Sequence, residues 1–295
     1  IRNISNLNGS TSIPTRFSQS ACARTSALTL IRASSCPARF SETMSAAKTQ
    51  QQKSEDALSI KNVGVSYGAF KAIQDVDLNV KAGECFGLIG LNGAGKTTLI
   101  KAILDLRTPS DGKILIFNQR AGTKAVKQRL AFLPERFEPP WFLTGLEFLK
   151  FSARMYKTSV SDAQCIEYAE RIALDPAALD RRVHTYSKGM RQKLGVLATI
   201  LTNCDLLILD EPMSGLDPVA RALVKTLIGE ARQKGCTVFL SSHILADMDE
   251  ICDRVAVMHD RSIRFTGKPD KLKALSGDLS LEQAFLHFIE QKSAA

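Results

Sequence analysis

The sequence has no long hydrophobic run. Of its 295 residues 44% are hydrophobic and 23% charged, yet no stretch approaches the roughly 18 consecutive apolar residues of a membrane-spanning helix. The apolar runs at residues 206–209 and 238–240 instead have the short length of buried strands. This composition is typical of a globular protein with one large domain or two small ones. We therefore expect any membrane role to need a partner chain.

Signals for paired cysteines are also missing. The seven cysteines are scattered, and no two of them form a CxxC pair. Such a set indicates neither a disulfide framework nor a zinc site of the common spacing. Cys85, Cys204 and Cys236 lie in or beside apolar strand-like runs, where a reduced core cysteine is the ordinary role. A reducing compartment fits this pattern best.

Acidic residues are scarce at the start of the chain. Residues 1–54 contain seven basic residues and one acidic residue, Glu42, so most of the net charge of +9 lies there. We predict a disordered N-terminal segment over residues 1–54. Two explanations are open: an organelle transit peptide, which has such an Arg- and Ser-rich composition, or translated upstream sequence before a true start at Met44. The rest of the chain is nearly neutral, so no nucleic-acid partner is expected.

Strand-like and helix-like patterns alternate after this segment. Residues 58–65 alternate with one slip, residues 76–80 alternate strictly, and both indicate antiparallel strands, followed by a strand at 113–117. Further strand-like runs are residues 85–89, 206–209, 237–241 and 255–258, and helix-like segments are residues 97–106, 145–172, 188–202 and 219–233. Strands that alternate with helices imply right-handed crossovers and a parallel sheet.

The most specific motif spans residues 90–97, with the sequence GLNGAGKT. It fits the phosphate-binding loop, in which glycines let the backbone curl around an anion at the start of a helix. Lys96 is expected to reach the β- and γ-phosphates, and Thr97 to ligate Mg²⁺. The residues that this loop would place against a nucleotide are Gly90, Asn92, Gly93, Ala94, Gly95, Lys96, Thr97 and Thr98.

Two carboxylates end the apolar run at residues 206–209. A buried strand would deliver Asp210 to the edge of the sheet, where Mg²⁺ held by Thr97 would lie. Glu211 would then hold and deprotonate an attacking water. The alternative is that Asp210 merely caps a helix, which the phosphate-binding loop makes less attractive.

Two further motifs make the prediction more specific. The segment 185–192, TYSKGMRQ, opens a helix with Ser187 as its N-cap, and residues 214–217, SGLD, follow the paired carboxylates. Together with Tyr67 and His243, these motifs stand in the order of the ATP-binding cassette (ABC) ATPases, which this sequence resembles over about residues 57–275. The resemblance implies an α/β fold with a P-loop NTPase parallel-sheet core, an antiparallel β subdomain and a helical signature subdomain.

The resemblance also implies roles for single residues. Tyr67 would stack on adenine, His243 would hydrogen-bond the γ-phosphate, and Asp217 would contact the opposing subunit. Two such domains pair head to tail in this family, so Ser187 and Gly189 of one chain would bind the ATP held by the other chain's phosphate loop. The expected ligands are ATP and Mg²⁺, and the expected catalytic residues are Glu211, His243 and Lys96.

Four positions depart from the family pattern. The signature usually reads Leu-Ser-Gly-Gly-Gln, whereas this chain has Tyr186 in place of Leu, Lys188 in place of the first Gly and Met190 in place of Gln. The family's glutamine-loop position corresponds to Glu135, which would either meet Mg²⁺ or its water, or be a solvated loop acid paired with Arg136. Ser187 and Gly189 are kept, so we expect function to survive.

Two apolar segments suggest partners. Trp141 and Phe142 lie where the family receives a membrane subunit, and they would either form a partner-binding patch or pack within their own subdomain. Residues 281–289 have apolar residues at helical spacing and resemble the C-terminal end of exporter ATPases that serve separate permeases of the ABC-2 type. We predict an ABC ATPase domain over residues 55–275 and an amphipathic helical tail over residues 276–295.

The predicted function is therefore that of a Mg²⁺-dependent ATPase subunit of an ABC transporter. It would form a homo- or heterodimer, bind a separate polytopic permease and lie peripherally on the cytoplasmic face of a membrane, or in an organelle if residues 1–43 are a transit peptide. The alternative is a non-transport ABC ATPase acting in DNA repair or translation. Such proteins typically carry a coiled-coil insertion or two cassettes, neither of which is seen in this sequence.

Overall fold

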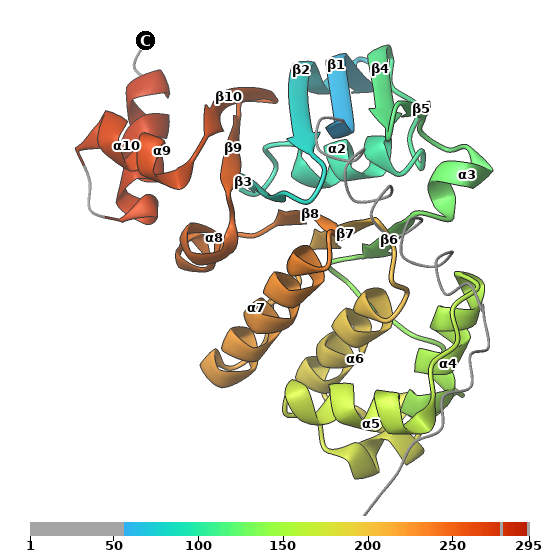
Figure 1. Cartoon of the computed structure of the whole chain (residues 1–295). Coiled ribbons are helices and arrows are strands. Elements are labelled where there is room, and N and C mark those ends of the chain that lie inside the picture. The colour runs from blue at the N-terminus through green and yellow to red at the C-terminus, as the bar shows by residue number, and fades with distance from the viewer. Residues whose placement is uncertain (1–55, 278–279, 294–295) are drawn as a thin grey trace, which may run out of the picture. The chain divides into compact units, whose positions relative to one another are not determined.

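We describe a computed structural model of the chain, in which residues 56–277 and 280–293 are placed (Figure 1). The prediction of a disordered segment over residues 1–54 lies outside the described residues. No described helix is both long enough and apolar enough to cross a membrane.

An antiparallel sheet forms the first part of the described chain. Its strands are ordered β2-β1-β4-β5 and comprise β1 (Asp56–Tyr67), β2 (Phe70–Lys81), β4 (Asp111–Ile116) and β5 (Gln119–Arg120). The slip expected within residues 58–65 is present, because the β1–β2 register shifts between Ile60 and Val63 and again between Val63 and Val65. The predicted antiparallel β subdomain is confirmed.

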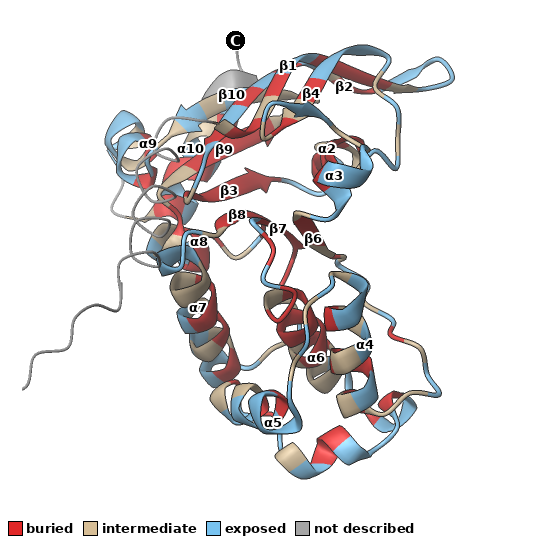
Figure 2. Ribbon diagram, turned by 45° about the vertical axis from the view of Figure 1, so that its right-hand side comes forward, coloured by how far each residue is buried: buried red, intermediate tan, exposed pale blue. Residues whose placement is uncertain are grey.

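A second, six-stranded sheet forms the core, in the order β10-β9-β3-β8-β7-β6. Its strands are β3 (Cys85–Gly90), β6 (Leu130–Leu133), β7 (Leu206–Asp210), β8 (Thr237–Ser241), β9 (Arg254–His259) and β10 (Ser262–Gly267). Neighbouring strands are parallel except for β10, which is antiparallel to β9. Every residue of β3, β7 and β8 is buried (Figure 2), which explains their uninterrupted apolar sequences.

The two faces of this core sheet pack against different layers. Because successive side chains of a strand point to opposite faces, Phe86 and Leu88 pack with helix α2 (Lys96–Ile103) and the antiparallel sheet. Cys85 and Ile89 pack instead on the opposite face, within the larger hydrophobic cluster. That cluster includes residues of α6 (Lys188–Ile200), α7 (Pro218–Gln233) and α8 (Leu245–Ile251).

A group of short helices packs on α6 and forms the helical subdomain at the lower right of Figure 1. It contains α4 (Gly145–Met155), α5 (Asp162–Arg171) and the 3₁₀ turns η1 (Pro176–Asp180) and η2 (Val183–Thr185). Helices α4 and α5 both begin with capping boxes, formed by Thr144 with Glu147 and by Ser161 with Gln164. The short helix α3 (Lys124–Lys127) precedes β6.

The C-terminal part ends in two helices, α9 (Pro269–Ser276) and α10 (Leu281–Ser293). The apolar residues that predicted a helix here form its buried face, including Leu281, Ala284 and Phe285. The hydroxyl of Ser276 donates to the carbonyl of Ala284 at 3.2 Å. Helix α10 thus packs on α9, and it also contacts α8.

Candidate nucleotide site

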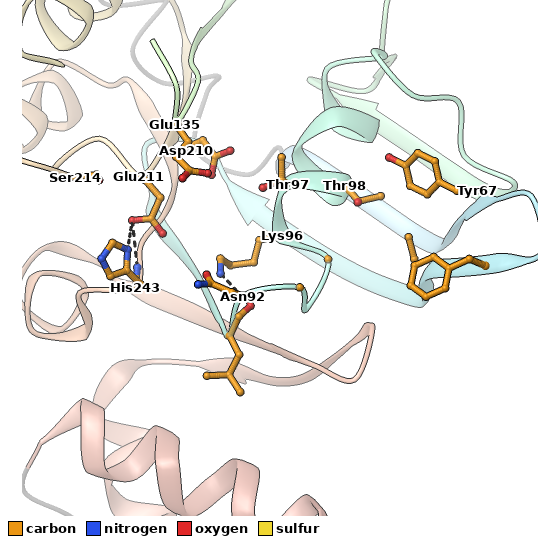
Figure 3. Close-up of a pocket in the computed structure, with 15 residues that line it drawn as sticks. Tyr67, Asn92, Lys96, Thr97, Thr98, Glu135, Asp210, Glu211, Ser214 and His243 are labelled. Atoms are coloured by element: carbon orange, nitrogen blue, oxygen red, sulfur yellow. Dashed lines mark hydrogen bonds and ion pairs between the residues drawn. The ribbon is translucent and has the colours of Figure 1, made fainter. Parts of the chain in front are cut away.

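A cavity of about 560 Å³ opens where the carboxyl ends of β3 and β7 face the β1–β2 hairpin (Figure 3). Its volume is in the range of small-molecule sites. The lining residues are Tyr67, Phe70, Ala72, Leu91, Asn92, Gly93, Gly95, Lys96, Thr97, Thr98, Glu135, Asp210, Glu211, Ser214 and His243. The fold therefore brings together predicted site residues from five separate parts of the sequence.

The phosphate-binding loop connects the end of β3 to the start of α2. Gly95 has φ 110°, and a Cβ there would lie 2.6 Å from Ile73 Cγ2. A Cβ on Gly90 would lie 2.6 Å from the carbonyl oxygen of Met258. No side chain caps the N-terminus of α2, so its first amides and its dipole remain available to an anion.

Lys96 lies across this loop. Its Nζ donates to the carbonyl oxygens of Gly90 at 2.6 Å and Leu91 at 3.3 Å. Burial lowers the pKa of the Lys96 ammonium, and this shift is opposed by the nearby carboxylates, chiefly Glu211 and Asp210. The ammonium is therefore held between the loop and the carboxylates, where phosphate oxygens would meet it.

Asp210 is the last residue of β7 and is buried. Its Oδ1 accepts a hydrogen bond of 2.5 Å from Ser241 Oγ, at the end of the neighbouring strand β8. Burial raises the pKa of the Asp210 carboxyl, and the bond from Ser241 opposes that rise. Sequence reasoning missed Ser241, although it stands directly before Ser242 and His243.

The donor set suits Mg²⁺. Asp210 and Thr97 line the same cavity and supply carboxylate and hydroxyl oxygens, the ligands that this ion prefers. Within residues 56–277 and 280–293, no three His, Cys, Asp or Glu side chains form a metal-binding group. Any ion there would take its remaining ligands from phosphate and water, as Mg²⁺ in nucleotide sites does.

Glu211 has a strained backbone, with φ 52°. Its N–H donates to the carbonyl of Ser241 at 3.2 Å. Its Oε2 accepts from the His243 N–H at 3.3 Å and lies 2.7 Å from His243 Nδ1. The resemblance implies that His243 contacts the γ-phosphate, whereas here its ring contacts Glu211, the predicted base.

Aromatic residues form the opposite wall of the cavity. The guanidinium of Arg107 lies 4.3 Å from the centre of the Tyr67 ring and donates to the carbonyl of Ser66 at 2.6 Å. Arg261 lies similarly over Phe70, at 4.7 Å. Sequence reasoning identified Tyr67 and missed the two arginines, which come from distant parts of the chain.

Five predicted ligand residues lie outside the cavity lining: Gly90, Ala94, Ser187, Gly189 and Asp217. Gly90 and Ala94 belong to the phosphate-binding loop itself, whereas the other three lie elsewhere in the sequence. Ser187 Oγ accepts from the Met190 N–H at 3.2 Å and caps α6. Asp217 Oδ1 accepts from the Ala220 N–H at 2.9 Å and caps α7, and this hydrogen bond lowers the pKa of the Asp217 carboxyl. Both side chains are exposed.

Comparison with known proteins identifies the family. The model of the ABC transporter family matches residues 73–214. The bacitracin transport ATP-binding protein BcrA of Enterococcus faecalis is 34% identical over 213 residues, which cover 70% of this chain and 67% of BcrA. The chain belongs to the ABC transporter ATP-binding family.

Two further relatives agree. An uncharacterised ABC transporter ATP-binding protein of Nostoc is 38% identical over 204 residues, covering 68% of this chain. A solved structure of an ATP-binding subunit of an ABC transporter has a TM-score of 0.72 and 32% identity, and the match covers 78% of this chain and 98% of that one. The match spans 61% of the length of the Nostoc protein. The predicted P-loop NTPase fold is confirmed.

The structure accounts for Tyr186, which replaces the leucine usual in the ABC signature. Its ring is buried, and its hydroxyl donates to the carbonyl of Ala178 at 2.6 Å. Space for that hydroxyl exists because residue 145 is glycine: a Cβ there would lie 2.2 Å from it. Burial raises the pKa of Tyr186 to about 12.

Glu135, which the resemblance assigns to the glutamine-loop position, is exposed and lines the cavity. Its carboxylate, like those of Glu211 and Asp210, acts to raise the pKa of Lys96, against the lowering effect of burial. It also contributes to the raised pKa of Asp210. Glu135 therefore adds negative charge to the side of the cavity where Asp210 lies.

Proposed function

We propose that this chain is the Mg²⁺-dependent ATPase subunit of an ABC transporter. The observation that carries the proposal is the convergence of Lys96, Thr97, Asp210 and Glu211 on one cavity, behind a glycine-lined loop at a helix N-terminus. This combination suits phosphoryl transfer, in which the protein mainly positions groups and neutralises charge.

In the proposed reaction, Glu211 accepts a proton from a water that attacks the γ-phosphorus, and ADP leaves. Lys96 and the amides at the start of α2 hold the phosphate oxygens. The contact of 2.7 Å with His243 orients the Glu211 carboxylate. Thr97 and Asp210 would hold Mg²⁺, which when bound neutralises charge on the β- and γ-phosphate oxygens.

The proposed working unit is a head-to-tail dimer. Ser187 and Asp217 are exposed and lie outside their own chain's cavity, so a second subunit can receive them. ATP bound between two chains would favour the closed dimer, and hydrolysis would release it. Both halves of the site are present in this sequence, so a homodimer suffices, and a heterodimer with a related chain is equally compatible.

A separate membrane permease is the proposed partner, which would put the chain peripherally on the cytoplasmic face of a membrane. Trp141 and Phe142 are 67% and 55% exposed and pack edge to face on each other. An exposed aromatic pair of this kind suits a protein interface. BcrA is named for bacitracin transport, and together with the likeness of the C-terminal helix this favours an exporter of the ABC-2 type.

The partner proposal is tested by replacing both Trp141 and Phe142 with alanine. Loss of co-purification with a polytopic membrane protein, with ATP binding unchanged, would support it. Leu275→Ala is a suitable control, because Leu275 is equally exposed at 67% but lies on α9. Unchanged co-purification of the double variant would contradict the assignment of this patch.

The alternative of a DNA repair or translation ATPase receives no support from the relatives described above, which are named as an ABC transporter ATP-binding protein and a bacitracin transport ATP-binding protein. Co-purification with DNA or RNA, in place of a membrane protein, would favour it.

Phosphate release from ATP tests the proposed activity. The full chain should release phosphate when Mg²⁺ is present and lose this activity in EDTA. A chain that binds ATP but releases no phosphate, alone or with its membrane partner, would contradict the proposal.

A further inference from the structure

Gln192 is a buried polar residue, 5% exposed, on helix α6. Its side-chain amide donates to the carbonyl oxygens of Glu211, at 3.2 Å, and Pro212, at 3.0 Å. These carbonyls belong to the residue that we propose as the catalytic base and to the one that follows it. A buried amide with both hydrogens used in this way fixes the chain that it contacts.

The backbone at Glu211 needs such support, because its φ of 52° is unfavourable for a residue with a side chain. On the amino side, the N–H of Glu211 donates to the carbonyl and hydroxyl oxygens of Ser241. On the carboxyl side, Gln192 holds the carbonyls of Glu211 and Pro212. The peptide planes that flank the Glu211 side chain are therefore fixed from two different elements, β8 and α6.

Helix α6 also contacts the segment that follows Glu211 and Pro212, at Gly215. A Cβ built on Gly215 would lie 3.2 Å from Cε of Lys188, in the first turn of α6. Ser187, which caps this helix, is the residue proposed to bind the partner's ATP. The N-terminal part of α6 thus carries the proposed contact with the second nucleotide and rests on the catalytic segment of its own chain.

We infer that Gln192 is a positioning residue that sets the orientation of the Glu211 carboxylate and ties it to helix α6. If ATP held by the second subunit displaced α6 through Ser187, the carbonyls of Glu211 and Pro212 would move. The proposed base would then move with them. The inference rests on the proposed function, because it assigns Gln192 to the same hydrolytic site. The inference adds a connection within one chain, between the signature segment at residues 185–192 and the proposed base, Glu211.

The first test is Gln192→Met, which keeps side-chain length and removes both donors. We expect kcat for ATP to fall by about tenfold or more, since small misplacements of a reacting group have effects of this order, with KM and nucleotide affinity within about twofold of wild type. Gln164→Met is the control: Gln164 accepts from the Ser161 N–H within the cap of α5, and its loss should leave kcat unchanged.

A second variant, Gln192→Glu, keeps the test decisive if the methionine variant does not fold. A neutral carboxylic acid can donate one hydrogen bond to a carbonyl, whereas a carboxylate cannot, and burial favours the neutral form. The activity of Gln192→Glu relative to wild type should therefore rise as the pH falls from about 8 to about 6.

Four results would overturn these assignments. A folded Gln192→Met with normal kcat, or a Gln192→Glu to wild-type ratio that does not change with pH, would overturn the inference alone. A parallel loss of kcat, affinity and thermal stability would assign Gln192 a purely structural role. A wild-type chain that binds ATP without hydrolysing it would instead overturn the proposed function, and this inference with it.

Discussion

The two groups of predicted ligand residues differ in how the fold presents them. Lys96, Asp210 and Glu211 converge on one cavity and bond to groups of their own chain. Ser187 and Asp217 are exposed helix caps outside that cavity. One chain thus presents two separate groups of candidate residues, one lining the cavity and one exposed at helix N-termini. Under the proposed function, a single copy would hold two half-sites.

The physical origin of this difference is the surrounding secondary structure. Asp210 and Glu211 follow a buried parallel strand whose neighbours β8 and β6 fix its end, so their positions follow from the core. Ser187 instead caps α6, which packs on helices α4 and α5 of the helical subdomain. Changes in the first half should therefore affect turnover or affinity within one chain, whereas changes in the second half should act on a partner.

The largest effect is expected for Glu211→Gln. An amide cannot accept the proton of the attacking water, so kcat should fall by about a hundredfold or more, while ATP binding persists. Phosphate release and equilibrium nucleotide binding measure the two quantities. Glu170→Gln, on the exposed surface of α5, is the control and should behave as wild type. Normal turnover in Glu211→Gln would show that another group is the base.

Lys96→Ala should lower the affinity for ATP and not only the rate of hydrolysis. Removing charge-assisted hydrogen bonds to phosphate should weaken ATP binding by about 10- to 100-fold. Lys101→Ala removes an exposed lysine from the same helix and should leave binding unchanged. Equal affinities for the two variants would remove Lys96 from the phosphate site.

A smaller effect is expected at Tyr67, where the adenine base of ATP would stack. Stacking of a base on an aromatic ring contributes about 1–3 kcal/mol, so Tyr67→Ala should weaken ATP binding by about 5- to 150-fold and Tyr67→Phe by much less. Inorganic tripolyphosphate lacks a base, so its affinity should not change. If Tyr67→Ala weakened the binding of ATP and of tripolyphosphate equally, the Tyr67 ring would act through the phosphate-binding loop and not by stacking on adenine.

The parallel core was largely predictable because its strands are buried on both faces. The sequence-based ranges 206–209 and 237–241 agree with β7 and β8 to within a residue. Strand β6, Leu130–Leu133, escaped prediction because four residues are too few to reveal a period. Helix α8 was missed for the same reason, since its seven residues make barely two turns.

The candidate site was predictable where its chemistry is local. The phosphate-binding loop carries its own glycines, and the paired carboxylates follow their strand directly. The contacts of Ser241 with Asp210 and of Gln192 with Glu211 join residues far apart in the sequence. They depend on β8 lying beside β7 and on α6 packing beneath the same strand end. No local pattern encodes that adjacency.

The most direct test of the central claim mixes two variants, each of which damages a different half-site. Lys96→Ala damages the phosphate half, and Ser187→Asp keeps a good helix cap while directing a negative charge at the partner's γ-phosphate. If each site is shared between two chains, an equal mixture should recover about a quarter of the wild-type ATPase activity, because half of the two-fold symmetric dimers would contain one intact site. A mixture no more active than the separate variants would contradict the account.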